Sequence, residues 1–334
     1  MANGVKALRK LQLGRQADSD SGDAIPATTI WRGMGTIEDA RNLYFVPEDV
    51  GILPGTDRTN TSQLNGKLTL DPTEGTYEQL PHILEMNVKT TTPTTDSGSG
   101  FIYEYAIPTT AGNTIKPYSI QGGDNNQAEV INFCHGADFT LAGDEGKAWM
   151  MSSNLFGRTV VNTTFTAALT LPTVYEMNFG QTLLYIDPDS NDWGTTLVST
   201  TLLQANLKYG SGLVPKYTAD GRLDYSFVVM TMPDIVLSLT FEHNTSAVTE
   251  KTNWRDETAR VIRLKNEGPA LTTPGVTYAN KTVIVDLVGK WEKFAKIGDR
   301  NGNDVLEGTF RGRYNAARAS SGKFIVVNEL SSIP

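Results

Sequence analysis

Two twenty-residue segments of this chain share one pattern and lie 155 residues apart, at Phe139–Arg158 and Phe294–Arg313. Each opens on Phe, carries Gly-Asp four residues later and closes on Gly-Arg, so that five of the twenty aligned positions are identical. In each segment turn-forming residues, Gly143–Gly146 and Gly298–Asn303, separate two strand-like runs. Turn residues between such runs are the local signal for a β-hairpin. The repeat therefore predicts one hairpin in each half of the chain.

Other features recur in the same order around the two hairpins. An irregular loop comes first, and it contains Gly51–Pro54 in one half and Gly212–Pro215 in the other. A strand, a helix and the strand that enters the hairpin follow in both halves. All-β proteins can repeat such patterns by chance, but the agreement of order and spacing favours an internal duplication. We predict two tandem domains, residues 1–165 and 166–334, divided near Val161–Pro172.

Most of the chain has the composition of short β-strands, rich in Thr, Val, Ile and aromatic residues and separated by Gly, Asn, Asp and Pro. Two segments predict helices: Thr76–Met86, with Pro81 in its first turns, and Ala247–Leu264, with Ser246 as its N-cap. Residues 261–264 also fit a strand. The predicted strands are Thr28–Met34, Leu64–Leu70, Phe101–Pro108, Ile115–Ile120, Ala128–Ala142, Lys147–Val160, Gln181–Ile186, Thr200–Tyr209, Arg222–Met230, Ile235–Glu242, Lys281–Ile297, Asp304–Tyr314 and Lys323–Glu329. This balance indicates a mainly β fold of antiparallel sheets, with a helix packed on each.

Composition narrows the classes of function. The 334 residues are enough for two domains that each bury a core. The net charge of −8, without a basic cluster, disfavours a protein that binds nucleic acid through its phosphates. It still allows a protein that encloses DNA without binding it. The single cysteine, Cys134, excludes an internal disulfide and suits a reducing compartment. No apolar run reaches the length of a membrane span, and the first residues lack the apolar core of a secretory signal.

The residues that usually carry catalysis are few and scattered. Cys134 and His135 are adjacent on a predicted strand, where their side chains point to opposite faces, which disfavours a catalytic pair. Asp187–Val198 and Asp299–Phe310 begin like calcium loops but lack Glu at the twelfth position, and we interpret both as turns. The other two histidines are His82 and His243. We predict no catalytic, cofactor-binding or metal-binding residue, and no enzyme.

Several segments together resemble a known family. The segments that carry the resemblance are Thr29–Asp39, Tyr77–Pro81, Lys290–Phe294, Gly308–Tyr314 and Val326–Leu330. On these residues the chain resembles the major tail tube proteins of long, flexible-tailed (siphovirus-type) bacteriophages and prophages. The similarity extends over essentially the whole chain. It rests on the overall pattern and not on a short motif of the kind that marks an active site.

The resemblance implies a tail-tube-type β-sandwich with a flanking α-helix in each half. It also implies a structural protein of the virion tail, assembled in the cytoplasm of the bacterial host. Single-domain members form six-fold rings that stack into a hollow tube, so a duplicated chain is expected to form trimeric, pseudo-hexameric rings, with hexameric rings as the alternative. The implied partners are copies of this chain, the tape-measure protein and other tail proteins. Double-stranded DNA would pass through the lumen without specific binding, and neither a cofactor nor a membrane is implied.

Within this expectation, the hairpin segments Lys147–Val160 and Asp304–Tyr314 are candidates to line the lumen. The long irregular loops Asn42–Ser62 and Gly210–Asp220 are candidates for contacts between stacked rings. Three arginines interrupt a uniformly acidic lumen wall, and these are Arg158, Arg311 and Arg313.

Two other classes of function remain open. One is a different β-sandwich component of a virion, such as a distal tail protein, a tail terminator or a decoration protein. The other is a non-viral two-domain binding module that recognises carbohydrate or a partner surface. The sequence separates these classes poorly, because all of them are built from sandwiches of short strands.

Overall fold

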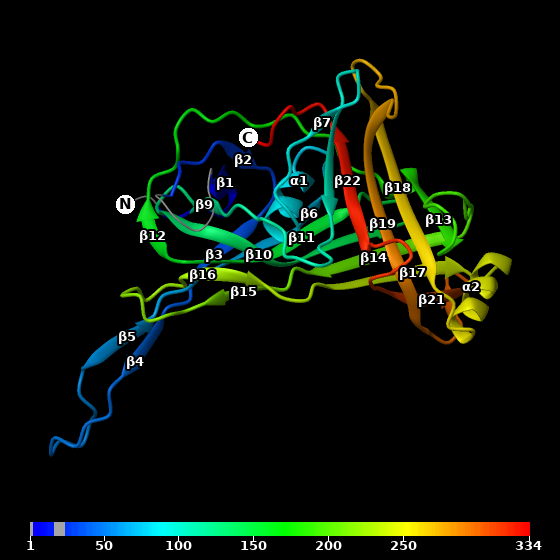
Figure 1. The fold of residues 1–334 in the computed structure, drawn as a ribbon. Helices are drawn as coiled ribbons and strands as arrows, with labels where there is room; N and C mark the ends of the chain where they lie inside the picture. The colour runs from blue at the N-terminus through cyan, green and yellow to red at the C-terminus, as the bar shows by residue number, and fades with distance from the viewer. Residues whose placement is uncertain (1–2, 17–23) are drawn as a thin grey trace.

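Two long antiparallel strands, Ala128–Asp144 and Asn280–Phe294, organise the protein. The computed structural model describes residues 3–16 and 24–334 (Figure 1). Its helices and strands in chain order are η1 (Lys6–Leu8), β1 (Lys10–Arg15), β2 (Thr29–Trp31), β3 (Gly35–Asp39), β4 (Asn42–Phe45), β5 (Thr59–Gln63), β6 (Gly66–Glu74), α1 (Leu80–Asn87), β7 (Thr94–Thr95), β8 (Phe101–Ala106), β9 (Tyr118–Gly123), β10 (Ala128–Asp144), β11 (Met150–Gly157), β12 (Val160–Thr163), η2 (Phe179–Gln181), β13 (Thr182–Pro188), β14 (Leu202–Gly210), β15 (Leu213–Lys216), β16 (Phe227–Met230), β17 (Asp234–Glu242), α2 (Thr245–Arg255), β18 (Arg260–Ala270), β19 (Asn280–Phe294), β20 (Gly298–Arg300), β21 (Asn303–Gly312) and β22 (Gly322–Asn328). The prediction of a mainly β, antiparallel protein is confirmed.

The strands around β10 and the strands around β19 follow one pairing pattern. The first part of β10 lies between β9 and β12, and the first part of β19 lies between β18 and β22. Further along, β10 pairs with β11 and β19 pairs with β21. Next to β11 come β6 and β3, and next to β21 come β17 and β14. Each long strand therefore connects two groups of strands, in the same order in both halves.

Both predicted hairpins are present, and each has a β-bulge at the matching place. The bulge leaves Ala137 of β10 and Glu292 of β19 without an opposite residue. These two residues are 155 positions apart, which is the spacing of the repeated segments. In the second hairpin, Asn301 and Gly302 form the turn between β20 and β21 with φ of 55° and 82°. A tight hairpin turn of this type needs positive φ at both central residues, which Asn and Gly adopt at low cost.

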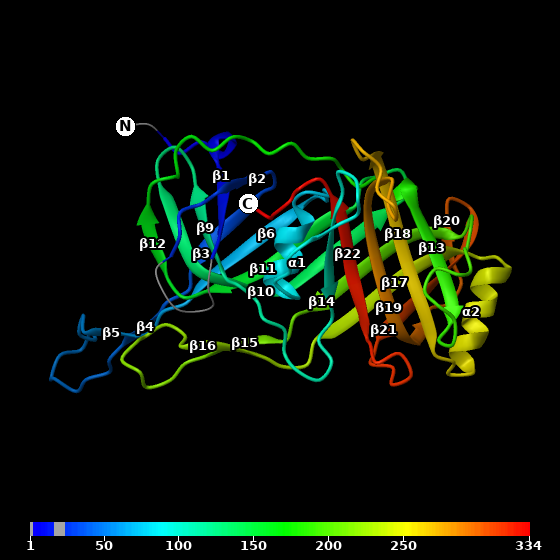
Figure 2. The same ribbon diagram turned by 45° about the horizontal axis from the view of Figure 1, so that its top comes forward.

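Eight strands form one continuous row, β3-β6-β11-β10-β14-β17-β21-β19, which runs through both halves (Figure 2). Its middle is the junction of β10 with β14, where seven residue pairs extend from Asp138 opposite Gly210 to Asp144 opposite Gln204. Among the described residues no pairing joins β3 to β19. The row is therefore open at both ends within one chain.

One large hydrophobic core lies behind this row and continues through both halves, and a smaller cluster forms around Leu271, Ile284, Ile325 and Val327. Leu68 and Leu70 of β6 and Leu237 and Leu239 of β17 are almost fully buried in it. Because side chains alternate along a strand, the residues between these leucines face away from the core. The row therefore has one apolar face and one polar face.

Two segments cross from one half of the chain to the other. β8 pairs with β22 over six residues, so a strand from the first half completes the sheet at the end of the second. Residues 166–179 run back along the first half, where Gln121 Oε1 accepts from the Thr166 amide at 2.9 Å and Glu78 Oε2 from the Tyr175 amide at 2.8 Å. The two halves are joined by these exchanges as well as by the β10–β14 junction.

The two helices differ from their predicted bounds. α1 starts four residues later than expected, with Pro81 in its first turn. α2 ends at Arg255, because the β-branched residues that follow Arg260 pair as β18 with β13 and β19. The prediction of Ser246 as N-cap is wrong, since the Asn244 side chain accepts the hydrogen bond from the Ala247 amide at 3.1 Å. Neither helix is long and apolar enough to cross a membrane, and this holds for every helix in the described part of the chain.

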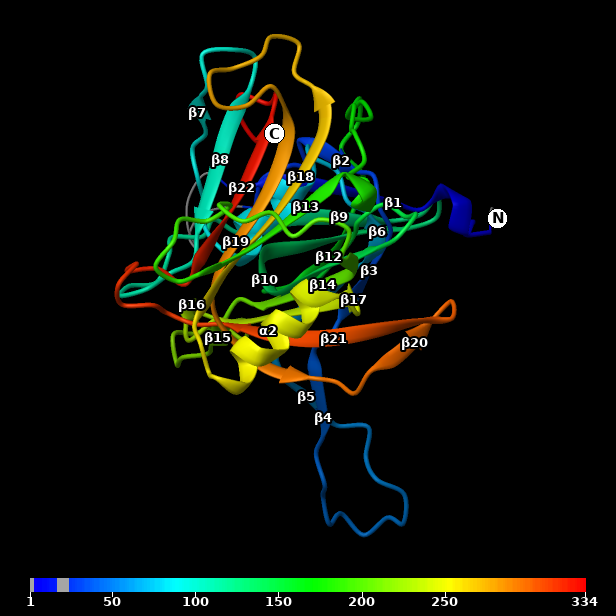
Figure 3. The same cartoon turned by 90° about the vertical axis from the view of Figure 1, so that its right-hand side faces the viewer.

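The two segments expected to be irregular loops, Asn42–Ser62 and Gly210–Asp220, each contribute to a hairpin. β4 pairs with β5 and β15 pairs with β16, each as a separate two-stranded sheet. The β4–β5 hairpin, which we call the arm, extends away from the rest of the molecule in all three views (Figure 3). The expected irregular backbone is present at the tip of the arm, residues 46–58, and at residues 217–226 between β15 and β16.

Candidate functional site

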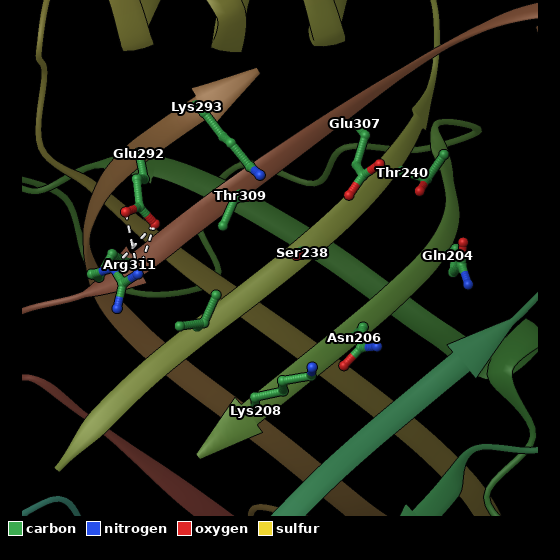
Figure 4. Close-up of a pocket in the computed structure, with 11 residues that line it drawn as sticks. Gln204, Asn206, Lys208, Ser238, Thr240, Glu292, Lys293, Glu307, Thr309 and Arg311 are labelled. Carbon is green, nitrogen blue, oxygen red and sulfur yellow. Dashed lines mark hydrogen bonds and ion pairs between the residues drawn. The ribbon is translucent and has the colours of Figure 1, made fainter. Parts of the chain in front are cut away.

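The polar face of the eight-stranded row carries a shallow groove of about 530 Å³ over β14, β17 and β21 (Figure 4). Its floor consists mainly of short uncharged side chains, since Asn206, Ser238 and Thr309 lie opposite one another on the three strands. Lys208, Lys293 and Glu307 stand at its sides. A surface of this composition stays hydrated and offers no apolar pocket that would hold a small molecule.

The polar face continues into the first half of the chain. Thr69 of β6 and Asp138 of β10 lie on the two sides of Asn154 of β11. The Asn154 side-chain amide donates to Asp138 Oδ1 at 2.9 Å. The strands β11 and β21, which the sequence singled out as candidates to line a lumen, thus both contribute to this one face.

Arg311 lies on the polar face, but two carboxylates neutralise its charge. Its guanidinium is 2.8 Å from Asp234 Oδ1 and 3.0 Å from Glu292 Oε2 (Figure 4). The bond to Asp234 raises the pKa of Arg311 further above its ordinary value. An arginine engaged in this way has few donors left for a phosphate.

Of the other two arginines of the predicted wall, Arg158 is buried and Arg313 lies near Asp234, the partner of Arg311. Arg158 follows β11 and is buried, with Nε donating to Tyr225 O at 3.1 Å and Nη2 to Ser226 O at 3.0 Å. Its guanidinium also packs on the Phe133 ring, 4.4 Å from the ring centroid. The expectation that Arg158 interrupts the lumen wall is therefore wrong. Arg313 lies just beyond β21 and is about half exposed, 3.8 Å from Asp234 Oδ1.

The two ends of the row are the second candidate surface. β3 pairs with β6 on one side, and the last part of β19 pairs with β21 on one side. On their other sides, no strand of the described residues pairs with Gly35–Asp39 or with Lys290–Phe294. Such edges expose backbone donors and acceptors that favour pairing with another strand, although the Glu292 carbonyl already accepts from Trp254 Nε1 of α2 at 3.2 Å. Sequence reasoning missed β3 as a strand, although Gly35–Asp39 alternates in the way that an edge strand does.

The arm is the third candidate surface, because it exposes large apolar side chains without covering any core. Phe45 is 65% exposed and Leu53 is fully exposed. Other exposed apolar residues of the arm are Leu43, Tyr44, Val50 and Ile52. Several large apolar side chains exposed together on a projecting hairpin are typical of a contact with another protein.

The titratable residues considered for catalysis do not gather in one place. His82 is buried on α1, Cys134 and His135 are buried on β10, and His243 is half-buried before α2. Burial raises the pKa of the Cys134 thiol well above its ordinary value, which makes it a poor nucleophile. Within residues 3–16 and 24–334, no group of three or more His, Cys, Asp or Glu residues could hold a metal ion.

The two calcium-loop-like segments are occupied by local hydrogen bonds. Asp187 Oδ2 accepts from the amides of Thr195 and Thr196 at 3.1 and 3.2 Å. Asp299 lies in the β20–β21 hairpin, opposite Asp304.

Neither a protein-family model nor a curated protein sequence matches this chain.

Proposed function

We propose that this protein is a structural subunit of a bacteriophage tail tube, in which copies of the chain form rings that stack into a hollow tube. The two tandem units would be tail-tube-type sandwich domains, approximately residues 1–165 and 166–334, so that three chains supply six wall segments. The protein would perform no reaction. Its partners would be further copies of itself, the tape-measure protein and other tail proteins of the virion.

The observation that carries this function is the open eight-stranded row. Each half contributes four strands in the same order, and β10 of the first half is joined to β14 of the second. By their pairing, β3 corresponds to β14 and β19 corresponds to β10. A second copy can therefore add its β3 to β19 in the way that β14 adds to β10. Repetition of a head-to-tail contact that closes by rotation gives a ring without open edges.

The two helices support the same arrangement. All eight residues of α1 are buried, and β22 of the second half packs on this helix together with β8 and β10 of the first half. In α2 only Ala247 and Glu250 are buried, and α2 lies at the right-hand end of the molecule in Figure 1. In a ring, the next chain would cover α2 as the second half covers α1.

The polar face would form the inner wall. Its cations lie beside carboxylates, since Arg311 contacts Asp234 and Glu292, Lys208 is diagonal to Asp138 and Lys67 is opposite Glu38, so DNA could slide past without the counterion release that drives binding. The arm would contact the adjacent ring through its exposed apolar residues.

Electron microscopy of the concentrated full-length protein tests this function. Negative staining should show hollow tubes of uniform bore, and averaged end views should show three chains per ring. Sedimentation velocity should show large particles that dissociate on dilution.

A persistent monomer at every concentration would contradict the proposal and favour a binding module. Discrete rings that never stack would favour another component of the virion, such as a terminator or a distal tail protein.

A further inference from the structure

The pairing registers show which residues of the two halves correspond at the ends of the row. Thr309 lies 155 positions after Asn154, and the strands next to them place Ser238 opposite Thr309 and Thr69 opposite Asn154. One strand further, Asn206 is opposite Ser238, and Thr36 is opposite Thr69. The β14 residues therefore correspond one by one to residues of β3.

The junction inside the chain has opposite charges on its two strands. Asp138 of β10 is opposite Gly210, and Lys208 of β14 is opposite Thr140. Asp138 and Lys208 are thus diagonal neighbours on the polar face, a separation that a long side chain can bridge. At this junction β10 carries the negative charge and β14 the positive charge.

At the open ends the same positions carry the reversed charges. Lys293 of β19 takes the place of Asp138, since the two are 155 residues apart and next to equivalent bulges. Glu38 of β3 takes the place of Lys208, by the register of β3 and β14 with their neighbours. Lys293 and Glu38 are both exposed. Lys67 of β6 lies opposite Glu38, so an incoming Lys293 would leave this carboxylate between two cations.

The charges near these two positions extend the pattern. Lys290 and Lys296 are exposed on the same part of the chain as Lys293. On β3 the next residue is Asp39, which forms an ion pair with Arg41. The edge of β19 therefore carries an excess of positive charge, since Glu292 is paired with Arg311, whereas Glu38 supplies the negative charge of the β3 edge, since Asp39 is paired with Arg41.

We propose that these opposite edge charges direct the pairing between copies, so that β19 of one chain accepts β3 of the next with Lys293 beside Glu38. This inference rests on the proposed function and identifies the residues that select the contact. An edge strand can also pair antiparallel with the same strand of a second copy, related by a two-fold axis. Such a contact yields a closed dimer in place of a ring. Pairing of β19 with β19 would bring lysines together, and pairing of β3 with β3 would bring carboxylates together. Like charges directly across a sheet are destabilising, so only the head-to-tail contact is favoured.

Charge matters more at this contact than at the internal junction. The internal junction also contains an aromatic pair on the core side, Phe139 with Tyr209. The corresponding residues at the open ends are Phe294 and Asp39, which cannot form such a pair. The contact between copies should therefore weaken with salt, since exposed charge pairs are screened by ions.

Charge reversal in the full-length protein tests this inference. The variants Lys293→Glu and Glu38→Lys each place like charges at the contact, and each should raise the concentration for half-assembly by about fivefold or more. The double variant carries both reversals and restores opposite charges, so it should assemble within about twofold of the wild type. Lys216→Glu makes the same change of charge as Lys293→Glu at an exposed position on β15, outside the eight-stranded row, and serves as the matched control.

Sedimentation velocity at low and high ionic strength gives the readout, with circular dichroism to confirm that each variant is folded. If the wild type forms rings but the single reversals assemble normally, or the double variant is not restored, the selection by edge charge is wrong and the proposed function stands. If the wild type forms no ring at any concentration, both are wrong.

Discussion

Phe139 of β10 stacks on Tyr209 of β14, with ring centroids 5.2 Å apart and ring planes inclined by 26°. Phe324 of β22 packs edge-on against both rings, at 5.6 and 5.7 Å. All three side chains are buried. The two halves of the chain are thus held together by aromatic packing from three strands in addition to backbone pairing.

The substitution Phe139→Ala should lower the free energy of unfolding by about 3–5 kcal/mol, because it leaves a cavity between Tyr209 and Phe324. Phe294 occupies the matching place in the second half but is only partly buried, against Trp254 and Trp291. For Phe294→Ala we expect a loss of no more than about 2 kcal/mol. Urea unfolding of both variants measures the two values, and equal losses would contradict the assignment of one closed and one open junction.

A buried ion pair also joins the halves and can be tested by substitution. Lys281 Nζ of β19 lies 2.5 Å from Glu78 Oε1 and 4.1 Å from the centroid of the Tyr175 ring. Lys281→Met leaves the Glu78 carboxylate buried without its cation, so we expect a loss of about 3–5 kcal/mol. Chemical denaturation measures it.

The matched control is the double variant Glu78→Gln, Lys281→Met. It removes both charges, so it should be more stable than Lys281→Met alone, with a coupling of about 0.5–3 kcal/mol between the two positions. If the two substitutions change the free energy of unfolding additively, the interaction between Glu78 and Lys281 contributes nothing to stability.

Deletion of the arm, Asn42–Ser62, with a short Gly-Ser linker in its place, should leave the protein folded, since β4 and β5 pair only with each other. Because the arm would provide the contact between rings, tubes should be lost while single rings remain. Thermal unfolding and negative staining measure the two effects. Unchanged tubes would refute the role of the arm.

A less drastic variant keeps the arm but replaces two of its exposed apolar residues, Phe45→Ser and Leu53→Ser. Neither side chain is part of the core, so the melting temperature should not change. Fewer and shorter tubes are expected, because the apolar area that the arm can bury is smaller.

His82 gives the stability of the protein a defined dependence on pH. Burial, followed by the nearby Arg15 charge, lowers the pKa of His82 to about 3. In the unfolded chain the same imidazole titrates near its ordinary pKa of 6.5. Between these values the unfolded state binds the extra proton, so stability present above pH 6.5 is lost as the pH falls, by about 1.4 kcal/mol per unit.

This dependence is measured by urea unfolding between pH 7 and 5. The variant His82→Gln, which removes the imidazole next to Tyr118, should show a flatter profile than the wild type over this range. If the stability of the wild type and of His82→Gln changes equally with pH, the proposed titration of His82 is wrong.

Local signals predicted the hairpins, whereas contacts distant in sequence could not be predicted. Asn301-Gly302 and the repeated Gly-Asp identified both hairpins, because turn geometry depends on neighbouring residues alone. The helix predicted over Ala247–Leu264 was too long, since tertiary pairing overrides the weak helix preference after Arg255. The predicted N-cap, Ser246, lies two residues after the actual N-cap, Asn244. The side chains of both residues can accept a hydrogen bond from an amide of the first helical turn, so the sequence did not distinguish them.

The candidate surfaces were harder to predict than the strands. The register of β10 with β14 joins residues far apart in sequence, and neither strand encodes its partner in its own pattern. Arg158 follows the repeated hairpin like Arg313, yet its place depends on the carbonyl groups of Tyr225 and Ser226. The correspondence of Lys293 to Asp138 and of Glu38 to Lys208 could be recognised only from the pairing registers of β19 with β21 and of β3 with β6.

The pairing of β8 with β22 has a consequence for the synthesis of this protein. Lys323 lies opposite Ala106, so β8 must wait for more than two hundred further residues to leave the ribosome before its partner strand exists. Until β22 emerges, β8 exposes an unpaired edge in a crowded cell, where it can associate with a neighbouring nascent chain. The emergence of Gly322–Asn328 therefore ends the period in which this edge is open to aggregation.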